Sequence, residues 1–580
     1  MRRFDLNPGA LSRAVALSAV SALVLAAGSA RGENWVSYGG NPQHTALSPG
    51  PSQLPQAVLW STPVDLDPQY SGSVLYIHYG SPVISAANVV FVPQKTTATG
   101  GFVVNAFKGG IGSQAWSMPT DYTLPAHNWT PPMGITLSRD NKVLAVPGGG
   151  GTVLVRTGPN SLNGTVIRMA FYGYKNYESN PAAFNSAIQI CTPITMDARH
   201  NMYFGYVSNG LALPGYPNGI PSGLARVPLS GSGSFAAATA LCGDNNIKKP
   251  AFNCAPALTT NGSTLYITVN QSSFSYGYLC RVKASTLAPI SNVALKDPRN
   301  ASWNVPIPDD GTASPTIGPD GDVYYGVLEA NFPSNHARGW MLHFDSTLAT
   351  VKTPGAFGWD DSASIVPANL VSSYTGSSSY LVLTKYNNYA DPGIGGDGQN
   401  KVAILDPNAT MSDPVTGATV MNEVITIVGP TKNPNLPGVD EWCINSAAVD
   451  MANACAVVNS EDGHVYRWSF ATNALSPGLK LAPPTGEAYT STVIGPDGAV
   501  YAINNAVLSC CVANGGSGVH RLGAADSDPS RRPQVAAKAA QSPGLSPRSQ
   551  ALYGLLVVMG VLAALSLQLA SSRVKRARSS

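Results

Sequence analysis

A hairpin motif that recurs along the chain restricts this sequence to a small set of folds. In its clearest copy, residues 314–325, a Ser-Pro-Thr-Ile run is followed by Gly-Pro-Asp-Gly and then by Asp-Val-Tyr-Tyr. Residues 491–501 repeat this pattern almost unchanged. Proline presets the backbone of a turn and glycine accepts a positive φ. Pro-Asp-Gly between two β-rich runs therefore predicts a tight β-hairpin.

Weaker copies of the motif begin near residues 81, 131, 192, 255, 364 and 446. A third strand candidate follows each copy, a fourth often does, and no long helical pattern interrupts them. Short strands in groups of four, repeated in this way, predict an all-β fold with a single β-propeller over residues 33–514. Eight four-stranded blades are the favoured count, and seven blades are the alternative.

One further strand candidate, Ala57–Pro63, lies ahead of all these repeats. The last repeat supplies only three strand candidates before the propeller ends. We therefore expect Ala57–Pro63 to complete the last blade, because this joins both ends of the ring and removes an exposed sheet edge.

The charge content excludes two classes of protein. Only 12% of the 580 residues are charged, with 35 Lys and Arg against 32 Asp and Glu. This is about half of the share usual for soluble globular proteins, whereas a cytosolic helical protein would carry far more charge on its surface. No basic run occurs outside the two ends of the chain, so we expect no nucleic-acid partner.

The two ends of the chain are typical of targeting segments. Residues 1–32 place arginines, an apolar stretch and small residues in the order of a secretory signal peptide. Residues 515–550, rich in Pro, Ser, Ala and Arg, predict a flexible stalk. Residues 551–570 carry no charge and predict a transmembrane helix, and residues 571–580 form a basic tail with a predicted cytoplasmic location. We therefore expect an exported propeller anchored in the membrane, with a cleaved sorting tail as the alternative.

The segment Trp35–Pro42, with the sequence Trp-Val-Ser-Tyr-Gly-Gly-Asn-Pro, resembles the opening segment of quinoprotein-like (PQQ-repeat) β-propellers. Residues 81–117 and the repeat that begins at Ser314 resemble units of the same family, so the resemblance covers residues 35 to 512. It implies the propeller fold and, for this chain, a non-catalytic or uncharacterised exported branch. Tandem tryptophan-docking repeats typical of the quinoprotein alcohol dehydrogenases are missing, which argues against bound PQQ.

Eight cysteines in a chain predicted to be exported favour disulfides. Two pairs are each twelve residues apart and a third is left by elimination: Cys242 with Cys254, Cys443 with Cys455, and Cys191 with Cys280. Free buried thiols are the alternative. No Cys-x-x-Cys pair and no histidine cluster with ligand spacing occurs, so the sequence predicts no zinc site.

The neighbouring Cys510 and Cys511 form a candidate disulfide or redox site. Vicinal cysteines can close a strained ring, and strained disulfides are easier to reduce. In quinoprotein alcohol dehydrogenases such a ring lies against the cofactor, but there it belongs to an early blade, and here it falls in the last. Pairing with other partners, or a reduced state, is the alternative.

The main site hypothesis comes from aligning the repeats. Residues just before each innermost strand of a propeller surround one mouth of the central channel. These positions hold three acids, a tryptophan and a histidine, with further acids beside them: Asp310, Asp360, Glu487, Trp442 and His127, with Asp361 and Glu441. Such a patch would attract a cationic or hydroxylated ligand, or recruit Ca²⁺. Solvated loop acids and catalytic carboxylates are the alternatives.

These patterns together favour a membrane-tethered extracytoplasmic propeller that binds an unknown ligand or protein without catalysis. The first alternative is a quinone-dependent oxidoreductase of the quinoprotein dehydrogenase type. The second is a carbohydrate-active enzyme that uses the carboxylates of the channel mouth.

Overall fold

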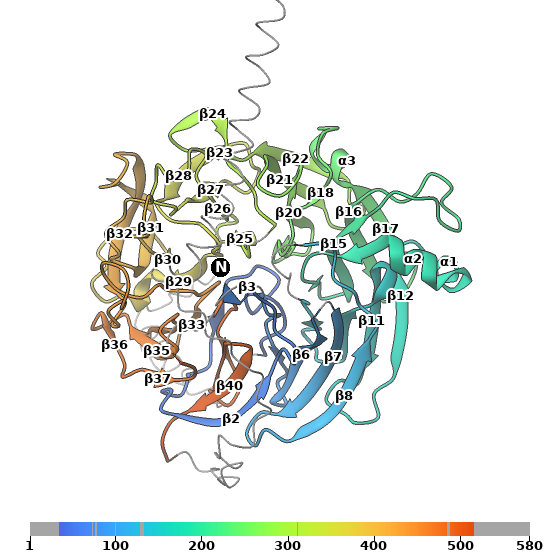
Figure 1. Cartoon of the computed structure of the whole chain (residues 1–580), viewed down its shortest axis with the longest axis horizontal. Helices are drawn as coiled ribbons and strands as arrows, with labels where there is room; N and C mark the ends of the chain where they lie inside the picture. The colour runs from blue at the N-terminus through green and yellow to red at the C-terminus, as the bar shows by residue number, and fades with distance from the viewer. Residues whose placement is uncertain are drawn as a thin grey trace, which may run out of the picture. The chain divides into compact units, whose positions relative to one another are not determined.

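The computed structural model describes residues 34–71, 74–75, 78–98, 100–127, 133–309, 311–483 and 488–515. Their strands form eight sheets of four or more strands, arranged as blades around a central axis (Figure 1). The predicted all-β propeller with eight blades is confirmed, and the seven-bladed alternative is wrong.

The first four blades follow one another along the chain from residue 83 to residue 294. Blade 1 contains β5 (Val83–Ile84), β6 (Val89–Thr97), β7 (Gly100–Lys108) and β8 (Gln114–Thr120). Blade 2 contains β9 (Thr136–Leu137), β10 (Val143–Pro147), β11 (Thr152–Thr157) and β12 (Val166–Ala170). Blade 3 contains β13 (Ile188–Ile190), β14 (Thr195–Met196), β15 (Asn201–Ser208), β16 (Gly223–Pro228) and β17 (Ser234–Ala237). Blade 4 contains β18 (Lys249–Pro250), β19 (Ala257–Leu258), β20 (Thr264–Asn270), β21 (Gly277–Lys283) and β22 (Pro289–Ala294).

The remaining four blades complete the ring. Blade 5 contains β25 (Thr316–Ile317), β26 (Val323–Val327), β27 (Trp340–Phe344) and β28 (Val351–Gly355). Blade 6 contains β29 (Ser364–Pro367), β30 (Tyr380–Tyr386), β31 (Lys401–Ser412) and β32 (Thr419–Val428). Blade 7 contains β33 (Ala448–Asp450), β34 (Cys455–Asn459), β35 (His464–Ser469), β36 (Ala474–Leu475) and β37 (Leu479–Lys480), and β1 (Leu47–Ser48) pairs with β33. Blade 8 contains β38 (Val493–Ile494), β39 (Val500–Asn504), β40 (Val507–Val512) and β2 (Ala57–Pro63).

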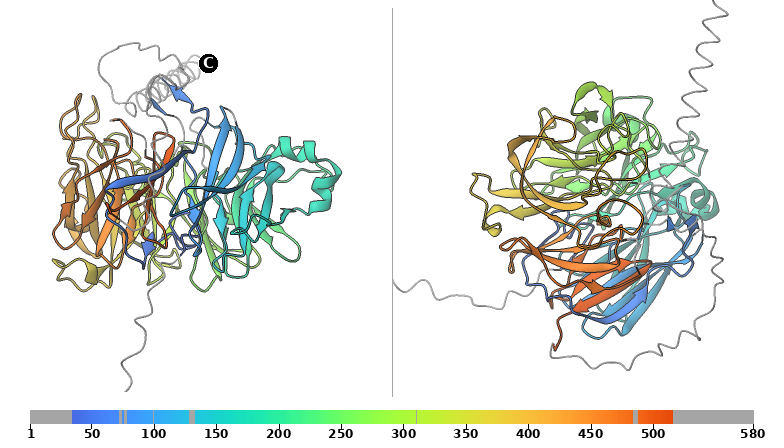
Figure 2. Two further views of the ribbon diagram at one scale, coloured as in Figure 1. Left: turned by 90° about the horizontal axis from the view of Figure 1, so that it is seen from below. Right: turned by 60° about the vertical axis from the view of Figure 1, so that its left-hand side comes forward.

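A few short elements lie outside the blades. They are the two-stranded sheets β3 (Tyr70–Ser71) with β4 (Val74–Leu75) and β23 (Lys296–Asp297) with β24 (Asn300–Asn304), the helices α1 (Tyr174–Ser179), α2 (Pro181–Ala187) and α3 (Ala238–Cys242), and the 3₁₀ turns η1 (Gly149–Gly151) and η2 (Ala368–Leu370). Helices α1 and α2 lie at the rim of the ring, next to β12 and β17 (Figures 1 and 2).

The ring closes as the sequence predicts. Strand β2 pairs antiparallel with β40, with Ala57 opposite Val512 and Pro63 opposite Val507. Blade 8 therefore combines the N-terminal strand with three strands from residues 493–512. This pairing covers the outer edge of β40 and holds the first blade against the last.

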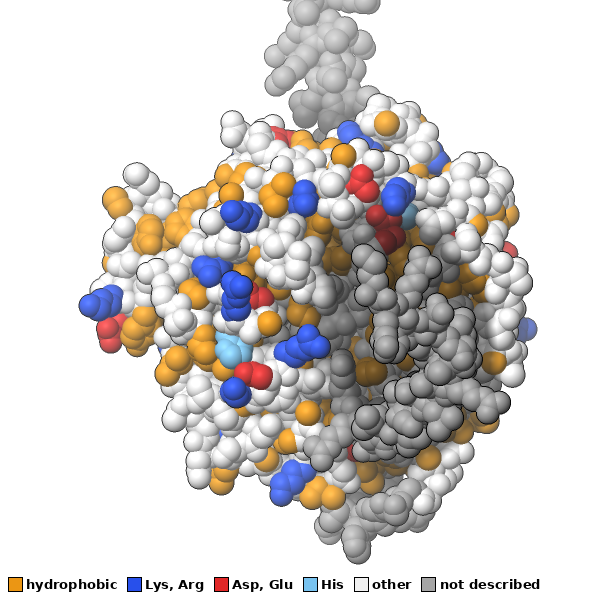
Figure 3. All heavy atoms as spheres, turned by 180° about the vertical axis from the view of Figure 1, so that it is seen from behind, with side chains coloured by type: hydrophobic (Ala, Val, Ile, Leu, Met, Phe, Trp, Pro, Cys, Tyr) orange, Lys and Arg blue, Asp and Glu red, His pale blue; other side chains and the backbone are white. Residues whose placement is uncertain are grey.

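The hydrophobic core is built mainly from the second strand of each blade. All residues of β20 and of β30 are buried, whereas no residue of the outer strand β22 is. Strands covered on both faces need continuous apolar runs, which is why the alternation of polar and apolar residues is weak in these repeats. On the face shown in Figure 3, Lys and Arg side chains are scattered among uncharged side chains, and some of them lie beside Asp or Glu.

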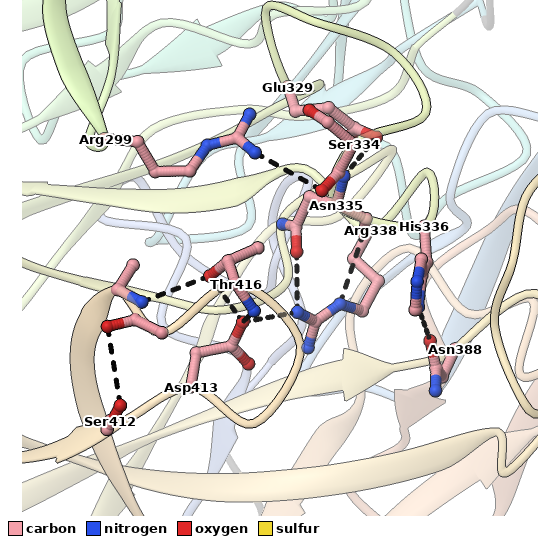
Figure 4. A network of polar contacts seen from close by, with 12 residues as sticks. Arg299, Glu329, Ser334, Asn335, His336, Arg338, Asn388, Ser412, Asp413 and Thr416 are labelled. Atoms are coloured by element: carbon pink, nitrogen blue, oxygen red, sulfur yellow. Dashed lines mark hydrogen bonds and ion pairs between the residues drawn. The ribbon is translucent and has the colours of Figure 1, made fainter.

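A buried polar network links blade 5 to blade 6 (Figure 4). The guanidinium of Arg338 lies 2.7 Å from the carboxylate of Asp413, and both side chains are almost fully buried. Asp413 also accepts hydrogen bonds from the backbone and hydroxyl of Thr416. Burial by itself would raise the pKa of Asp413, but the hydrogen bond and charge of Arg338 hold that pKa below its usual range. Glu329 anchors the adjacent loop by accepting from the backbone N–H groups of Ala337 and Gly339.

The predicted transmembrane helix needs a correction. Among the described residues, no helix is long and apolar enough to cross a membrane. The predicted span, residues 551–570, lies outside the described part of the chain, so membrane anchoring has no structural support. The predicted signal peptide, most of the stalk and the basic tail also lie outside the described residues and stay predictions.

The predicted disulfides are wrong, because all eight cysteines are buried free thiols. Cys455 begins β34, whereas the thiol of Cys443 lies within 4.8 Å of the Glu461 carboxylate, beyond the other end of that strand. The four steps of β34 at about 3.3 Å per residue span about 13 Å, more than the Cα separation of about 7 Å that a disulfide allows. Cys510 and Cys511 are consecutive residues of β40, so their side chains point to opposite faces of the sheet and cannot close a ring.

Candidate functional site

A segment near the start of the described chain runs along the innermost strands inside the ring. We call residues 35–46 the plug segment. Its carbonyl groups accept hydrogen bonds from the second residue of the innermost strand in six blades: Trp35 from Ile84, Val36 from Leu137, Pro42 from Leu258, Gln43 from Ile317, Thr45 from Ile365 and Ala46 from Val449, at 2.7–3.0 Å. The plug segment thus winds around the inside of the ring and pairs with strand edges that would otherwise be open.

A small cavity remains beside the plug segment, at the end of the channel where the innermost strands begin. We call this end the channel mouth. Its volume is about 20 Å³, room for about one water molecule. Tyr38 of the plug segment lines it together with residues that precede the innermost strands, among them Asn253, Thr312 and Asn445. The hydroxyl of Tyr38 donates to the carbonyl of Thr312, lies 2.6 Å from the hydroxyl of Ser362, and also contacts Asn445.

These contacts show that equivalent positions of neighbouring blades meet at the channel mouth. The backbone N–H of Ser362 donates to the carbonyl of Asn445 at 3.0 Å, and the Asn445 amide donates to the carbonyl of Thr312 at 2.9 Å. The hydroxyl of Ser446 lies 2.7 Å from that of Ser491. The premise of the site hypothesis, that residues before each innermost strand share one end of the ring, therefore holds for blades 5 to 8.

Asp360 and Asp361 lie on this ring of residues and are both buried. Asp360 accepts from the backbone N–H and the hydroxyl of Thr312, which ties blade 6 to blade 5. Asp361 contacts the hydroxyl of Thr384, at the end of the second strand of its own blade. Burial raises the pKa of Asp361 well above its usual range, and the positive charge of Lys385 opposes this increase.

A second group of acids surrounds the mouth side of blade 7. Glu441, Cys443 and Glu461 offer one ligand atom each, and these atoms lie within 4.8 Å of one another. The three residues are buried, with exposed fractions of 5%, 0% and 7%. Burial and the negative charges of Asp462 and Glu441 raise the pKa of the neighbouring Asp440 to about 6. Negative potential is therefore concentrated here.

The other predicted site residues have different positions. Trp442 is fully buried and packs in the core, with its ring centroid 5.9 Å from that of Tyr466, while its backbone bonds to the Asn387 amide. His127 is partly buried, with Nδ1 2.5 Å from the carbonyl of Pro125. Asp310 and Glu487 lie outside the described residues, so their predicted place at the mouth stays a prediction.

Glu461, and the position of Cys443 beside it, were not predicted from the sequence. The signal was present, because β33 and β34 form an antiparallel hairpin in which Ala448 lies opposite Val457. Residues that precede the first strand of such a hairpin and residues that follow the second lie at the same end. The residues that precede each innermost strand therefore form only part of the channel mouth. Residues that follow the second strand, such as Glu461, form another part.

Burial leaves the thiols of Cys510 and Cys254 with little reactivity. It raises the pKa of Cys510 to about 12 and that of Cys254 to about 11. A thiolate is the reactive form of cysteine, so these residues behave as small apolar side chains at neutral pH. The predicted redox role of Cys510 and Cys511 is not supported, because the two residues form no disulfide ring and offer no accessible thiolate.

The chain matches no protein-family model and no curated protein. Among solved structures it is similar in fold to a europium-containing methanol dehydrogenase, at 9% identity and a TM-score of 0.47, over 81% of this chain and 89% of that one. It is also similar to a quinohemoprotein alcohol dehydrogenase from Comamonas testosteroni, at 11% and 0.44, over 81% and 76%. BamB from Moraxella catarrhalis matches at 11% and 0.39, over 79% and 98%. At these identities and TM-scores the similarity concerns the propeller fold alone.

Proposed function

We propose that this protein is a binding propeller whose ligand site lies at the channel mouth beside blade 7, and that the ligand is a divalent metal ion. The observation that carries the proposal is the grouping of Glu441, Cys443 and Glu461, whose ligand atoms lie within 4.8 Å of one another. A cation would offset the repulsion among carboxylates that the raised pKa of Asp440 reports.

The donor set favours one kind of ion. Two carboxylates and a thiol suit Zn²⁺, which proteins bind through Cys, His and carboxylate ligands in a tetrahedral arrangement. Ca²⁺ binds six to eight oxygen ligands, whereas one of the three donors at this site is the sulfur of Cys443. The thiol at this site therefore shifts the expectation from Ca²⁺ toward Zn²⁺.

The burial of the site favours an ion over a sugar chain. Glu441 and Glu461 are close enough for a retaining glycosidase, in which the carboxyl groups are about 5–5.5 Å apart. They are only 5% and 7% exposed, however, and a polysaccharide must reach both carboxylates at once. A metal ion needs only a narrow path to the same atoms.

Co²⁺ substitution tests this site directly, because a thiolate bound to Co²⁺ gives a charge-transfer absorption that carboxylates do not. We expect the band in the wild-type protein and in Cys455→Ser, a matched change of another buried cysteine of blade 7. We expect no band in Cys443→Ser and weaker binding in Glu461→Gln.

Thermal unfolding with added Zn²⁺ provides the second readout. Ion binding to the folded state raises the melting temperature by mass action, about 2.7 kcal/mol of stabilisation at an ion concentration one hundred times the dissociation constant. The increase should be lost in Glu461→Gln and kept in Glu178→Gln, which changes an exposed glutamate of α1. The proposal is overturned if Co²⁺ produces no charge-transfer band in the wild-type protein and Zn²⁺ does not raise its melting temperature.

A further inference from the structure

A second concave site lies on the rim of the propeller, far along the chain from the channel-mouth acids. It is formed by the edge strand β12 and residues 171–174 of blade 2, and by residues 227–235 of blade 3, with Tyr216 from the loop between β15 and β16. Its volume is about 660 Å³. Pockets for small ligands measure about 300–1,000 Å³. Figure 1 shows β12, β17 and α1 together on this side of the ring.

Aromatic side chains form the wall of this rim cavity. The ring of Phe235 meets those of Phe171 and Tyr216 edge to face, at centroid distances of 5.6 and 6.1 Å. The hydroxyl of Tyr216 donates to the carbonyl of Tyr172 at 3.0 Å, which fixes the orientation of its ring. Tyr174, at the start of α1, is 44% exposed and lies at the edge of the cavity. Phe171 is only 1% exposed, so the aromatic surface open to the cavity comes from Tyr174, Tyr216 and Phe235.

The backbone on the blade 3 side lies unusually close to this wall. A side chain at Gly233 would place its Cβ 2.5 Å from the Cα and carbonyl oxygen of Phe171. Only glycine permits this approach, which brings the turn at residues 231–233 against the aromatic residues. Ser232 and Ser234, on either side of Gly233, add hydroxyl groups to the lining.

The cavity carries no free charge for an ionic ligand. Arg168 is the one charged residue among those that line it. Its guanidinium lies 2.9 Å from the carboxylate of Asp121 and also donates to the hydroxyls of Thr152 and Tyr177. Because Asp121 neutralises this charge, a neutral ligand fits the cavity better than an anion.

One lining group has no hydrogen-bond partner within the described part of the chain. The hydroxyl oxygen of Ser234 is buried and unpaired there. A hydroxyl can donate one hydrogen bond and accept two, so an unpaired one is best satisfied by a ligand that does both. In this rotamer the Ser234 oxygen has almost no exposed surface, so a turn about χ1 must direct it into the cavity, where a hydroxylated ligand would satisfy it.

We propose that the rim cavity binds a neutral saccharide. Exposed aromatic rings stack on the apolar faces of pyranose rings, and the Ser234 hydroxyl turns to pair with a sugar hydroxyl. The ion pair of Arg168 with Asp121 leaves no free charge to favour an ionic ligand. The volume accommodates more than one sugar ring, and the open side lets a longer chain continue into solvent. This site is independent of the proposed metal site.

Isothermal titration calorimetry of the full-length protein with neutral gluco-, manno- and xylo-oligosaccharides tests the proposal. We expect at least one series to bind, with affinity that rises from one to three sugar units. Tyr174→Ala and Ser234→Ala should each weaken that binding at least fivefold. Tyr70→Ala, which removes a tyrosine that is 57% exposed outside this cavity, should bind like the wild type.

Glu461→Gln separates the two proposed sites, because it should lose the metal response and keep saccharide binding unchanged. The rim-cavity proposal is overturned if no neutral oligosaccharide binds, or if Tyr174→Ala and Ser234→Ala both bind with wild-type affinity. It is also overturned if the cavity binds only acidic sugars or extended peptides. Circular dichroism confirms that each variant is folded before it is titrated.

Discussion

Closure of the ring by β2 depends strongly on one side chain, Trp60. Its ring lies 5.3 Å from Phe107 of blade 1 and 5.9 Å from Tyr501 of blade 8, measured between centroids. Its indole N–H donates to the carbonyl of Gly109 at 2.7 Å. Trp60 therefore joins the closing strand to blade 1 as well as to its own blade, so its removal should loosen the contact between the first and last blades.

The expected cost of Trp60→Ala follows from these contacts. Truncation of a fully buried tryptophan costs about 3–5 kcal/mol. Trp60 is only partly buried, so the loss of packing should fall near about 2 kcal/mol, and the lost hydrogen bond adds about 1 kcal/mol. Trp60→Ala should therefore lower the free energy of unfolding by about 3 kcal/mol. Trp60→Phe keeps an aromatic ring and should lower it by about 1 kcal/mol.

Urea unfolding followed by circular dichroism measures both variants on one scale. Trp303→Ala is the matched control, because Trp303 lies in β24, outside the eight blades, and is 38% exposed. Its change should stay within about 0.5 kcal/mol, as is usual for surface positions. If Trp60→Ala costs no more than Trp303→Ala, β2 does not hold the ring closed.

Three further predictions concern charge and thiols. The pKa of Asp440 is raised from 3.8 to about 6, so stability should fall as pH rises between these values, and Asp440→Asn should raise the melting temperature at pH 7 but not below about pH 4. Asp413→Asn should cost about 3–5 kcal/mol in urea unfolding, because it leaves the Arg338 guanidinium buried without its counter-charge, and Arg338→Met in the same chain should recover part of this loss. Without reductant, Ellman's reagent should label eight cysteines after unfolding and almost none before it, whereas fewer than eight in the unfolded chain would reveal a disulfide.

Much of the fold could be predicted from local patterns in the sequence. Pro-Asp-Gly hairpins such as the one at residues 318–321 and the strand pairs around them are set by turn chemistry and β propensity within a few residues. Their regular return along the chain identified the blades, and the missing partner of the last blade identified Ala57–Pro63 as the closing strand. These predictions succeeded because each depends on chain neighbours or on the sheet edge that a propeller cannot leave open.

Contacts between distant parts of the chain were decided only by the tertiary structure. The distance from Cys443 to Cys455, and the opposite directions of Cys510 and Cys511, depend on strand geometry that residue spacing does not report. The path of residues 35–46 along the innermost strands of six blades depends on the width of the closed ring. Glu461 meets Glu441, and Tyr216 meets Phe235, only after hairpins and blades have packed. Residue types and local periods determine strands and turns, whereas sites form from side chains that packing brings together across the ring.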